Sequence, residues 1–266
     1  MTTKTDQFRV HHDGVTIPVS RRGRGRPLVL CPGLLTTQAD LRELTHLLRR
    51  DFDVITFDLR GHGLSTGTAQ YSFTAFRSDF VAVMAELRRR GLPSAPVLVG
   101  HSLGADVIVH YAAEHPDAGT ELVLVDGANP LPEPFLTEAD LPWFRGLWEE
   151  LVSGHEAYRG TARQMLLTVE QILDLNVELD RIRSGILDQY QNIDSPIRMI
   201  MSASMAGSSE EERAGRYNRN WRAGIERLVR ERPNIATSWL DADHGLVLTH
   251  APHIAGIIRE RRHPAC

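Results

Sequence analysis

The segment 100–104, which reads GHSLG, carries the clearest chemical signal in this chain of 266 residues. It fits the pattern G-x-S-x-G, follows a short apolar run and precedes a helical pattern at 105–114. In that context the serine occupies a strained turn between a strand and a helix, and its hydroxyl projects into a cleft. Because chain segments crowd the turn, the positions of Gly100 and Gly104 require small residues. Ser102 is therefore predicted to be a nucleophile.

A serine hydroxyl is a weak nucleophile until a neighbouring base takes its proton. Among the 12 histidines, His244 is predicted to be this base. It lies in DADHGLVL, just past the predicted last strand at 234–242, where the topology of a sheet returns the chain to the cleft. His62, in the loop that follows the predicted strand at 51–61, could line the cleft or pack the loop.

Predicted strands alternate with predicted helices along most of the chain. Apolar runs bounded by turn residues predict strands at 8–10, 15–19, 27–33, 51–61, 95–100, 120–127, 196–204 and 234–242. Helical spacing predicts helices at 39–50, 73–92, 105–114, 221–230 and 254–261. Such alternation indicates an α/β fold with a parallel sheet covered on both faces.

The segment 130–195 breaks this alternation because it has helical pattern and no convincing strand. We therefore expect an insertion between two strands of the sheet. The core domain is predicted to comprise residues 1–129 and 196–266, so it uses both ends of the chain. The helical insertion itself comprises residues 130–195.

The sequence resembles the α/β-hydrolase family in five segments that occur in the family's order: PLVLCPGL, FDLRGHGLS, VLVGHSLG, LVLVDG and DADHG. The resemblance spans nearly the whole chain. It implies a mostly parallel, eight-stranded sheet flanked by helices, with a helical cap inserted after the sixth strand. By matching, it implies an oxyanion hole formed by the backbone N–H groups of Leu34 and Leu103. Such donors stabilise the negative charge of a tetrahedral intermediate.

The position of the third triad residue departs from the family's commoner pattern. Most members carry an aspartate shortly after the strand that matches 196–204, but here no acid follows until Glu210. A minority, including lactonases of the zearalenone-hydrolase type, carries the acid at the end of the preceding strand. Asp126, in LVLVDG, fills that place. The prediction favours Asp126 over Glu210 as the residue that orients His244.

The predicted cap is rich in large apolar residues. Most of them are expected to form the cap's own core and its contact with the sheet. Trp143, Phe144 and Trp148 are the candidates for an apolar substrate pocket. Together with the predicted serine nucleophile, such a pocket leads us to expect an ester or lactone of a moderately apolar small molecule as the substrate.

These features predict a serine hydrolase that works through an acyl-enzyme. A thioesterase, an acyltransferase or a C–C hydrolase would use the same residues with another leaving group or acceptor. A non-hydrolytic binding protein or a cofactor-free lyase is the alternative from another class, because a fold does not fix a function.

Composition limits the other classes of function. The net charge of −4 argues against a nucleic-acid partner, which usually binds a basic face. No uncharged apolar run approaches the roughly 20 residues of a membrane span. The first ten residues lack the apolar core of a signal peptide, and two cysteines cannot form a disulfide framework, so a cytoplasmic location is expected. No spacing suggests a metal or an organic cofactor. The oligomeric state is left open.

Overall fold

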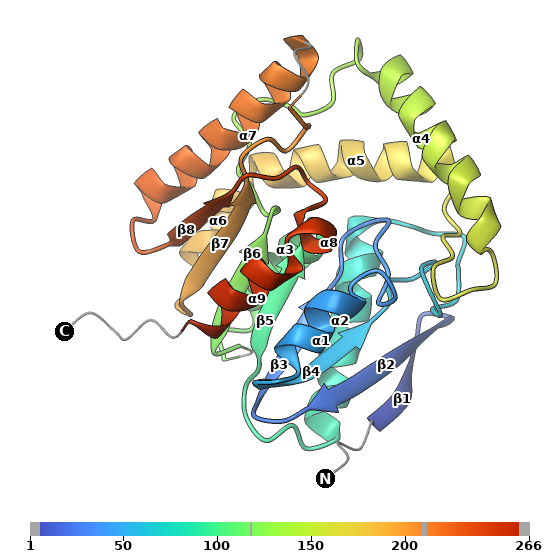
Figure 1. Cartoon of the computed structure of the whole chain (residues 1–266), viewed down its shortest axis with the longest axis vertical. Helices are drawn as coiled ribbons and strands as arrows, with labels where there is room; N and C mark the ends of the chain where they lie inside the picture. The colour runs from blue at the N-terminus through green and yellow to red at the C-terminus, as the bar shows by residue number, and fades with distance from the viewer. Residues whose placement is uncertain (1–5, 118, 209–211, 261–266) are drawn as a thin grey trace.

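The computed structural model describes residues 6–117, 119–208 and 212–260. Its centre is an eight-stranded sheet in the order β1-β2-β4-β3-β5-β6-β7-β8 (Figure 1). The strands are β1 (Asp6–His12), β2 (Val15–Gly23), β3 (Arg26–Cys31), β4 (Phe52–Phe57), β5 (Val97–His101), β6 (Glu121–Val125), β7 (Ile197–Ser202) and β8 (Ala236–Leu240). This confirms the predicted fold class.

Only the first two strands depart from the parallel arrangement. β1 and β2 form a hairpin through Asp13 and Gly14, both with positive φ, and β2 pairs antiparallel with β4. Such a two-residue turn matches the twist of the strands that it joins. From β4 to β8 every neighbouring pair is parallel. The carboxyl ends of these six strands therefore share one edge, where the segments that follow them can meet.

Helices cover both faces of the sheet, as the near-continuous apolar strands require. On one face, α1 (Arg42–Leu48), α8 (Leu246–Thr249) and α9 (Ala251–Arg259) bury leucine and isoleucine side chains against the strands. On the other face, α2 (Phe73–Arg89), α3 (Leu103–Glu114) and α7 (Glu212–Glu231) contribute to a second and larger core. The helix predicted at 221–230 is thus the second half of α7.

The segment between β6 and β7 is helical, and its longest helices lie beyond the carboxyl edge of the sheet (Figure 1). It holds α4 (Leu141–His155), the short 3₁₀ helix η1 (Glu156–Tyr158), α5 (Val169–Ser184) and α6 (Ile186–Gln191). The loop between η1 and α5 meets the loop after β4, where the N–H of Leu166 donates to the carbonyl of Gly61 at 2.8 Å. The boundaries of the cap at 130 and 195 stay a prediction.

Two glycines allow the turn after β5 to pack against the turn after β3. A Cβ on Gly104 would lie 2.3 Å from the carbonyl oxygen of Cys31, and one on Gly100 would lie 2.5 Å from that of Gly104. Real Cβ atoms do not approach backbone oxygens so closely. Small residues are therefore required on both sides of Ser102.

We expect Gly104→Ala to destabilise the protein by about 1–3 kcal/mol, because the added methyl group forces the backbone of α3 away from β3. Gly146→Ala is the matched control, since Gly146 lies inside α4 and a Cβ there meets nothing within 4 Å. This change should stabilise the protein by roughly 0.5–1 kcal/mol. Urea unfolding measures both. Equal stability of Gly104→Ala and the unchanged protein would contradict this packing argument.

Candidate active site

Ser102 occupies a strained turn between β5 and α3. Its backbone has φ 50° and ψ −121°, a conformation that L-residues rarely adopt. The N–H of Ser102 donates to the carbonyl of Val125 at the end of β6, at 3.0 Å, which holds the turn on the neighbouring strand. The turn therefore fixes the serine at the carboxyl edge of the sheet, as the G-x-S-x-G pattern predicts.

The structure brings Ser102, His244 and Asp126 together, although 142 positions separate the serine from the histidine. His244 Nε2 lies 2.9 Å from Ser102 Oγ, and His244 Nδ1 lies 2.8 Å from Asp126 Oδ2. Because a carboxylate only accepts, Nδ1 carries the proton and Nε2 is free to take one from the serine hydroxyl. This is the geometry that a general base and its orienting acid require.

Asp126 is completely buried at the end of β6 and accepts four hydrogen bonds. Oδ1 accepts from the backbone N–H of Ser202 at 2.9 Å and from the indole N–H of Trp221 at 2.9 Å. Oδ2 accepts from the hydroxyl of Ser202 at 2.7 Å and from His244. Burial alone would raise the pKa of Asp126, but the hydrogen bonds from His244 and Ser202 lower it below its ordinary value.

Glu210, the alternative acid, lies outside the described residues. Asp243, next to His244, forms a hydrogen bond within its own loop, where its Oδ1 accepts from the N–H of Gly245 at 2.8 Å.

Leu34 and Leu103 lie on the two turns that approach the serine. Leu103 is the first residue of α3, so its N–H has no partner within the helix. Leu34 follows Gly33, at which a Cβ would lie 3.0 Å from Ser102 Cβ. In the described part of the chain no hydrogen bond occupies either N–H. Their role as oxyanion donors stays a prediction.

His62 packs the loop beside this turn rather than offering a second base. Its Nδ1–H donates to the carbonyl of Arg60 at 2.9 Å, and Nε2 accepts from the N–H of Leu35 at 3.1 Å. Leu35 has φ 64°, so this hydrogen bond fixes a strained residue directly after Leu34. Burial lowers the pKa of His62 to about 4 and keeps its ring neutral.

His101 lies against His244, a contact that the sequence does not reveal. The ring centroids are 5.2 Å apart, and His101 Nε2–H donates to the carbonyl of His244 at 3.2 Å. Burial, together with the neighbouring His244, lowers the pKa of His101 to about 3. A neutral His101 therefore supports the histidine loop without adding charge beside it.

The three predicted pocket aromatics differ in exposure. Phe144 is buried in an aromatic cluster with Phe135 and Tyr217, whose ring centroids lie 5.9 and 5.8 Å away. Trp143 is 42% exposed, and Trp148 is half-buried. Phe144 thus packs the helical segment against Tyr217 on α7, and contact of any of the three with a substrate stays a prediction.

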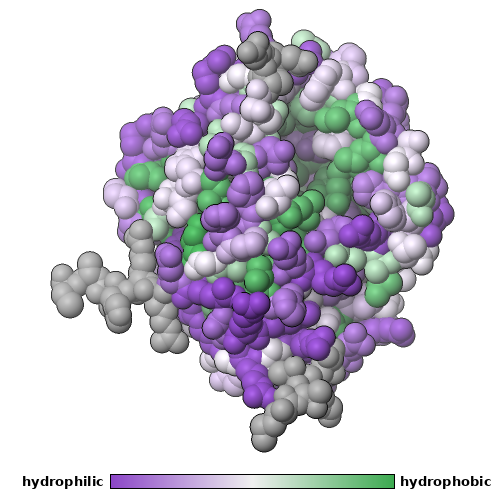
Figure 2. Space-filling view, in the orientation of Figure 1, coloured by the Kyte–Doolittle hydropathy of each residue, from purple (hydrophilic) through white to green (hydrophobic). Residues whose placement is uncertain are grey.

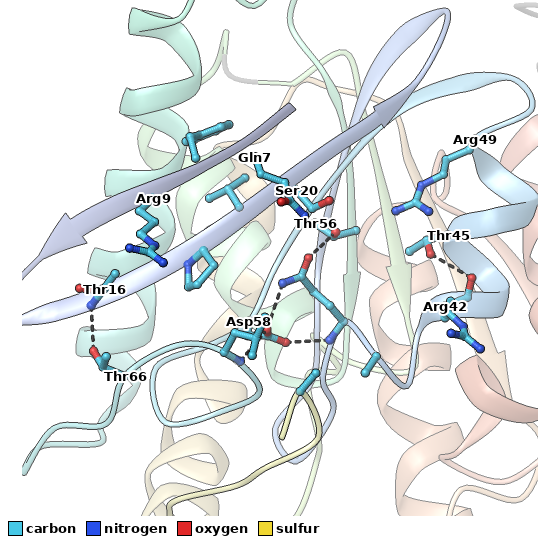
Figure 3. A pocket seen from close by; sticks show the side chains of 17 residues that line it. Gln7, Arg9, Thr16, Ser20, Arg42, Thr45, Arg49, Thr56, Asp58 and Thr66 are labelled. Atoms are coloured by element: carbon cyan, nitrogen blue, oxygen red, sulfur yellow. Dashed lines mark hydrogen bonds between the residues drawn. The ribbon is translucent and has the colours of Figure 1, made fainter. Parts of the chain in front are cut away.

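A cavity of about 1080 Å³ lies between β1, β2 and α1, and none of Ser102, His244 and Asp126 lines it (Figure 3). The side chain of Gln38 lines this cavity. Its amide N–H donates to Asp58 Oδ2 at 3.0 Å, and its amide oxygen accepts from the hydroxyl of Thr56 at 2.6 Å. Asp58 thus anchors loops, and this cavity is separate from the candidate active site.

Two general properties of the described residues bear on membranes and metal ions. None of their helices has the length and apolar character needed to cross a membrane. Nor do three or more of their His, Cys, Asp or Glu side chains gather in a way that could hold a metal ion.

A family model described as the alpha/beta hydrolase fold matches residues 26–162. 2-(Acetamidomethylene)succinate hydrolase of Mesorhizobium japonicum is 29% identical over 205 residues, which cover 74% of this chain and 67% of that protein. N-formylmaleamate deformylase of Pseudomonas putida is 33% identical over 124 residues, which cover 46% of this chain and 45% of that protein. The second match thus spans less than half of the relative's length.

Solved structures show the same fold at low sequence identity. The crystal structure of E-2-(acetamidomethylene)succinate hydrolase has a TM-score of 0.66 at 20% identity and covers 97% of this chain and 100% of that one. An esterase from Thermogutta terrifontis has a TM-score of 0.69 at 18% identity, with 96% and 97% coverage.

The buried histidines predict how stability depends on pH. His62 and His101 have folded-state pKa values of about 4 and about 3, below the ordinary value of 6.5. Between pH 6.5 and 4 the unfolded chain therefore binds protons that the folded chain excludes, and stability falls on acidification by up to about 1.4 kcal/mol per pH unit for each histidine.

Replacing His62 by Gln keeps a donor and an acceptor but removes one of these titrations. We expect the slope of unfolding free energy against pH to decrease by about one proton in His62→Gln. The slope of the unchanged protein, measured alongside, is the reference. Urea unfolding at several pH values measures the slopes, and an unchanged slope in His62→Gln would show that His62 is not held neutral.

Proposed function

Since this chain belongs to the alpha/beta hydrolase family, we propose that it is a serine hydrolase which cleaves a carboxylic ester or lactone of a moderately apolar small molecule. The observation that carries the proposal is the hydrogen-bonded series Ser102–His244–Asp126, with contacts of 2.9 and 2.8 Å. Relatives named as a hydrolase and a deformylase support hydrolysis as the general reaction.

In the first half of the reaction His244 Nε2 takes the proton of Ser102 while Oγ attacks the acyl carbonyl. The N–H groups of Leu34 and Leu103 stabilise the resulting oxyanion. When the intermediate collapses, the protonated His244 gives its proton to the leaving alkoxide, and the acyl group stays on Ser102. Asp126 stabilises the imidazolium that forms between these steps.

In the second half a water molecule replaces the alcohol. His244 takes a proton from the water, whose oxygen attacks the acyl carbon, and the carboxylic acid leaves as Ser102 recovers its proton. A lactone follows the same path, but its alcohol and acid remain one molecule.

Hydrophobic residues near the carboxyl edge of the sheet support an apolar substrate. Figure 2 shows hydrophobic residues inside a hollow between α4 and α7. Large apolar side chains of α4 and α8 are also exposed, and a contiguous group of such side chains is typical of a binding site. They are Trp143, Leu147 and Leu248.

The test combines covalent labelling with turnover. A fluorophosphonate probe should label the unchanged protein at Ser102, as intact mass and peptide mapping will show, whereas Ser102→Ala should stay unlabelled. Turnover should appear with p-nitrophenyl esters or lactones and fall by several orders of magnitude in Ser102→Ala. Absence of labelling, while a known serine hydrolase is labelled alongside, would contradict the proposal.

The same panel separates the alternative substrates. Acyl thioesters test a thioesterase, and N-acyl amides test the chemistry that the names of the two relatives suggest. A protein that is labelled but prefers one of these groups would keep the acyl-enzyme and lose the ester or lactone assignment.

A further inference from the structure

A buried ion pair links the helix that follows the nucleophile to a helix beyond the edge of the sheet. Asp106 lies on α3, one turn after Ser102, and Arg183 lies on α5. Arg183 Nη2 lies 2.7 Å from Asp106 Oδ2, and Arg183 Nε lies 3.1 Å from Oδ1. The side chain of Asp106 is 0% exposed and that of Arg183 is 10% exposed. Such a bidentate contact fixes the guanidinium in one orientation.

The same guanidinium faces the residue that holds the triad acid. Arg183 Cζ lies 5.8 Å from the ring centroid of Trp221 on α7, within the range of a cation–π contact. The indole N–H of Trp221 donates to Asp126 Oδ1 at 2.9 Å, and its ring meets that of His244 edge-on at 6.1 Å. One side chain therefore separates Arg183 from both Asp126 and His244.

Few other titratable groups face the ion pair of Arg183 and Asp106. Beside Arg183, α5 contributes Asp180, whose Oδ2 accepts from the N–H of Leu136. Around Asp106, α3 contributes His110, and α6 contributes Tyr190, whose hydroxyl donates to the carbonyl of Ala128. Burial lowers the pKa of His110 and raises those of Asp180 and Tyr190. Around His244, the neighbours are Asp126, the neutral His101 and Asp243.

Arg183 remains charged in this setting. Burial alone would lower its pKa, but Asp106, with contributions from Asp180 and Asp126, raises it above its ordinary value. The positive charge of Arg183 therefore acts electrostatically on the triad unless a nearby carboxylate offsets it. Asp106 is the carboxylate in direct contact with it.

We infer that Arg183 and Asp106 form a charge-balanced support for the triad. Arg183 is a positioning residue that packs on Trp221 and keeps the indole N–H on Asp126. Asp106 holds Arg183 in place and cancels the positive charge that would otherwise oppose the protonated form of His244. This inference rests on the proposed function, because it assigns His244 the part of a base.

The test uses the rate at which a fluorophosphonate labels Ser102, measured from about pH 4.5 to 9, so that no natural substrate is needed. In this reaction Ser102 Oγ bonds to phosphorus, fluoride leaves, and His244 takes the proton. The rate has an acidic limb, because a general base must be unprotonated to take this proton. Arg183 Cζ and the His244 ring lie 5.8 and 6.1 Å from the ring centroid of Trp221, and a charge within this range in a partly buried site shifts the midpoint of such a limb by on the order of half to one pH unit.

In Asp106→Asn the charge of Arg183 is no longer offset. We expect the midpoint of the acidic limb to move to lower pH by about half to one unit. In Asp106→Asn/Arg183→Gln both charges are gone, so the midpoint should return to within about 0.2 units of the unchanged protein. The control is Glu121→Gln, which removes the carboxylate that contacts Arg26 and Arg198 at the opposite edge of the sheet and should not move the midpoint.

Positioning through Trp221 has a separate readout. The neutral double variant lacks the guanidinium, so its maximal labelling rate should fall, by about 3- to 10-fold. Trp221→Phe should lower the rate by about 10-fold or more in the unchanged protein, because a hydrogen bond to a charged group is lost. In the double variant, Trp221→Phe should lower the labelling rate by a clearly smaller factor, because the effects of residues that act through one another are not additive.

The outcomes separate the two proposals. No labelling of the unchanged protein contradicts the proposed function itself. Normal labelling with one common midpoint in all folded variants contradicts charge balance, and additive effects of Trp221→Phe contradict positioning. Circular dichroism identifies a variant that fails to fold. If Asp106→Asn is that variant, Arg183→Gln tests charge balance in its place: the unpaired carboxylate of Asp106 should move the midpoint to higher pH, and an unmoved midpoint would contradict charge balance.

Discussion

The buried carboxylate of Asp126 is the constraint on which the rest of the site depends. A carboxylate withdrawn from water costs several kcal/mol unless its oxygens are fully hydrogen-bonded. Its four donors come from β7, from α7 and from the loop after β8. The residues that satisfy Asp126 are thus spread over the second half of the chain, so the core and the site must form together.

The carboxyl edge of the sheet also contains several strained turns. Leu35, Ser102, Asp126 and Ala128 all have positive φ, and each such residue costs on the order of 1–3 kcal/mol. Hydrogen bonds between neighbouring turns oppose this cost. The N–H of Ser102 bonds to the carbonyl of Val125, and that of Asp126 bonds to the carbonyl of Ile200. The parallel strands therefore hold nucleophile and acid in register.

Local patterns predicted the sheet, Ser102 and His244, because an apolar run, a glycine-flanked serine and a histidine just past the last strand carry that information. The choice of Asp126 over Glu210 depended on the resemblance to the α/β-hydrolase family. The sequence did not reveal Trp221 or Ser202, which reach Asp126 across 95 and 76 positions. Nor did the sequence show which aromatic residues of the helical segment pack in the interior and which could contact a ligand. The helical spacing that marks Phe144 as apolar is the same whether its face meets Phe135 and Tyr217 or a ligand.

The hydrogen bond between His244 and Asp126 is the contact that most directly tests this account. Proton NMR detects the Nδ1 proton of an imidazole that donates to a carboxylate as a resonance far downfield of the amide envelope. The account predicts this resonance in the unchanged protein and in Glu210→Gln, and its loss in a folded Asp126→Asn variant. A resonance that survives in Asp126→Asn and disappears in Glu210→Gln would contradict the assignment of Asp126 as the triad acid.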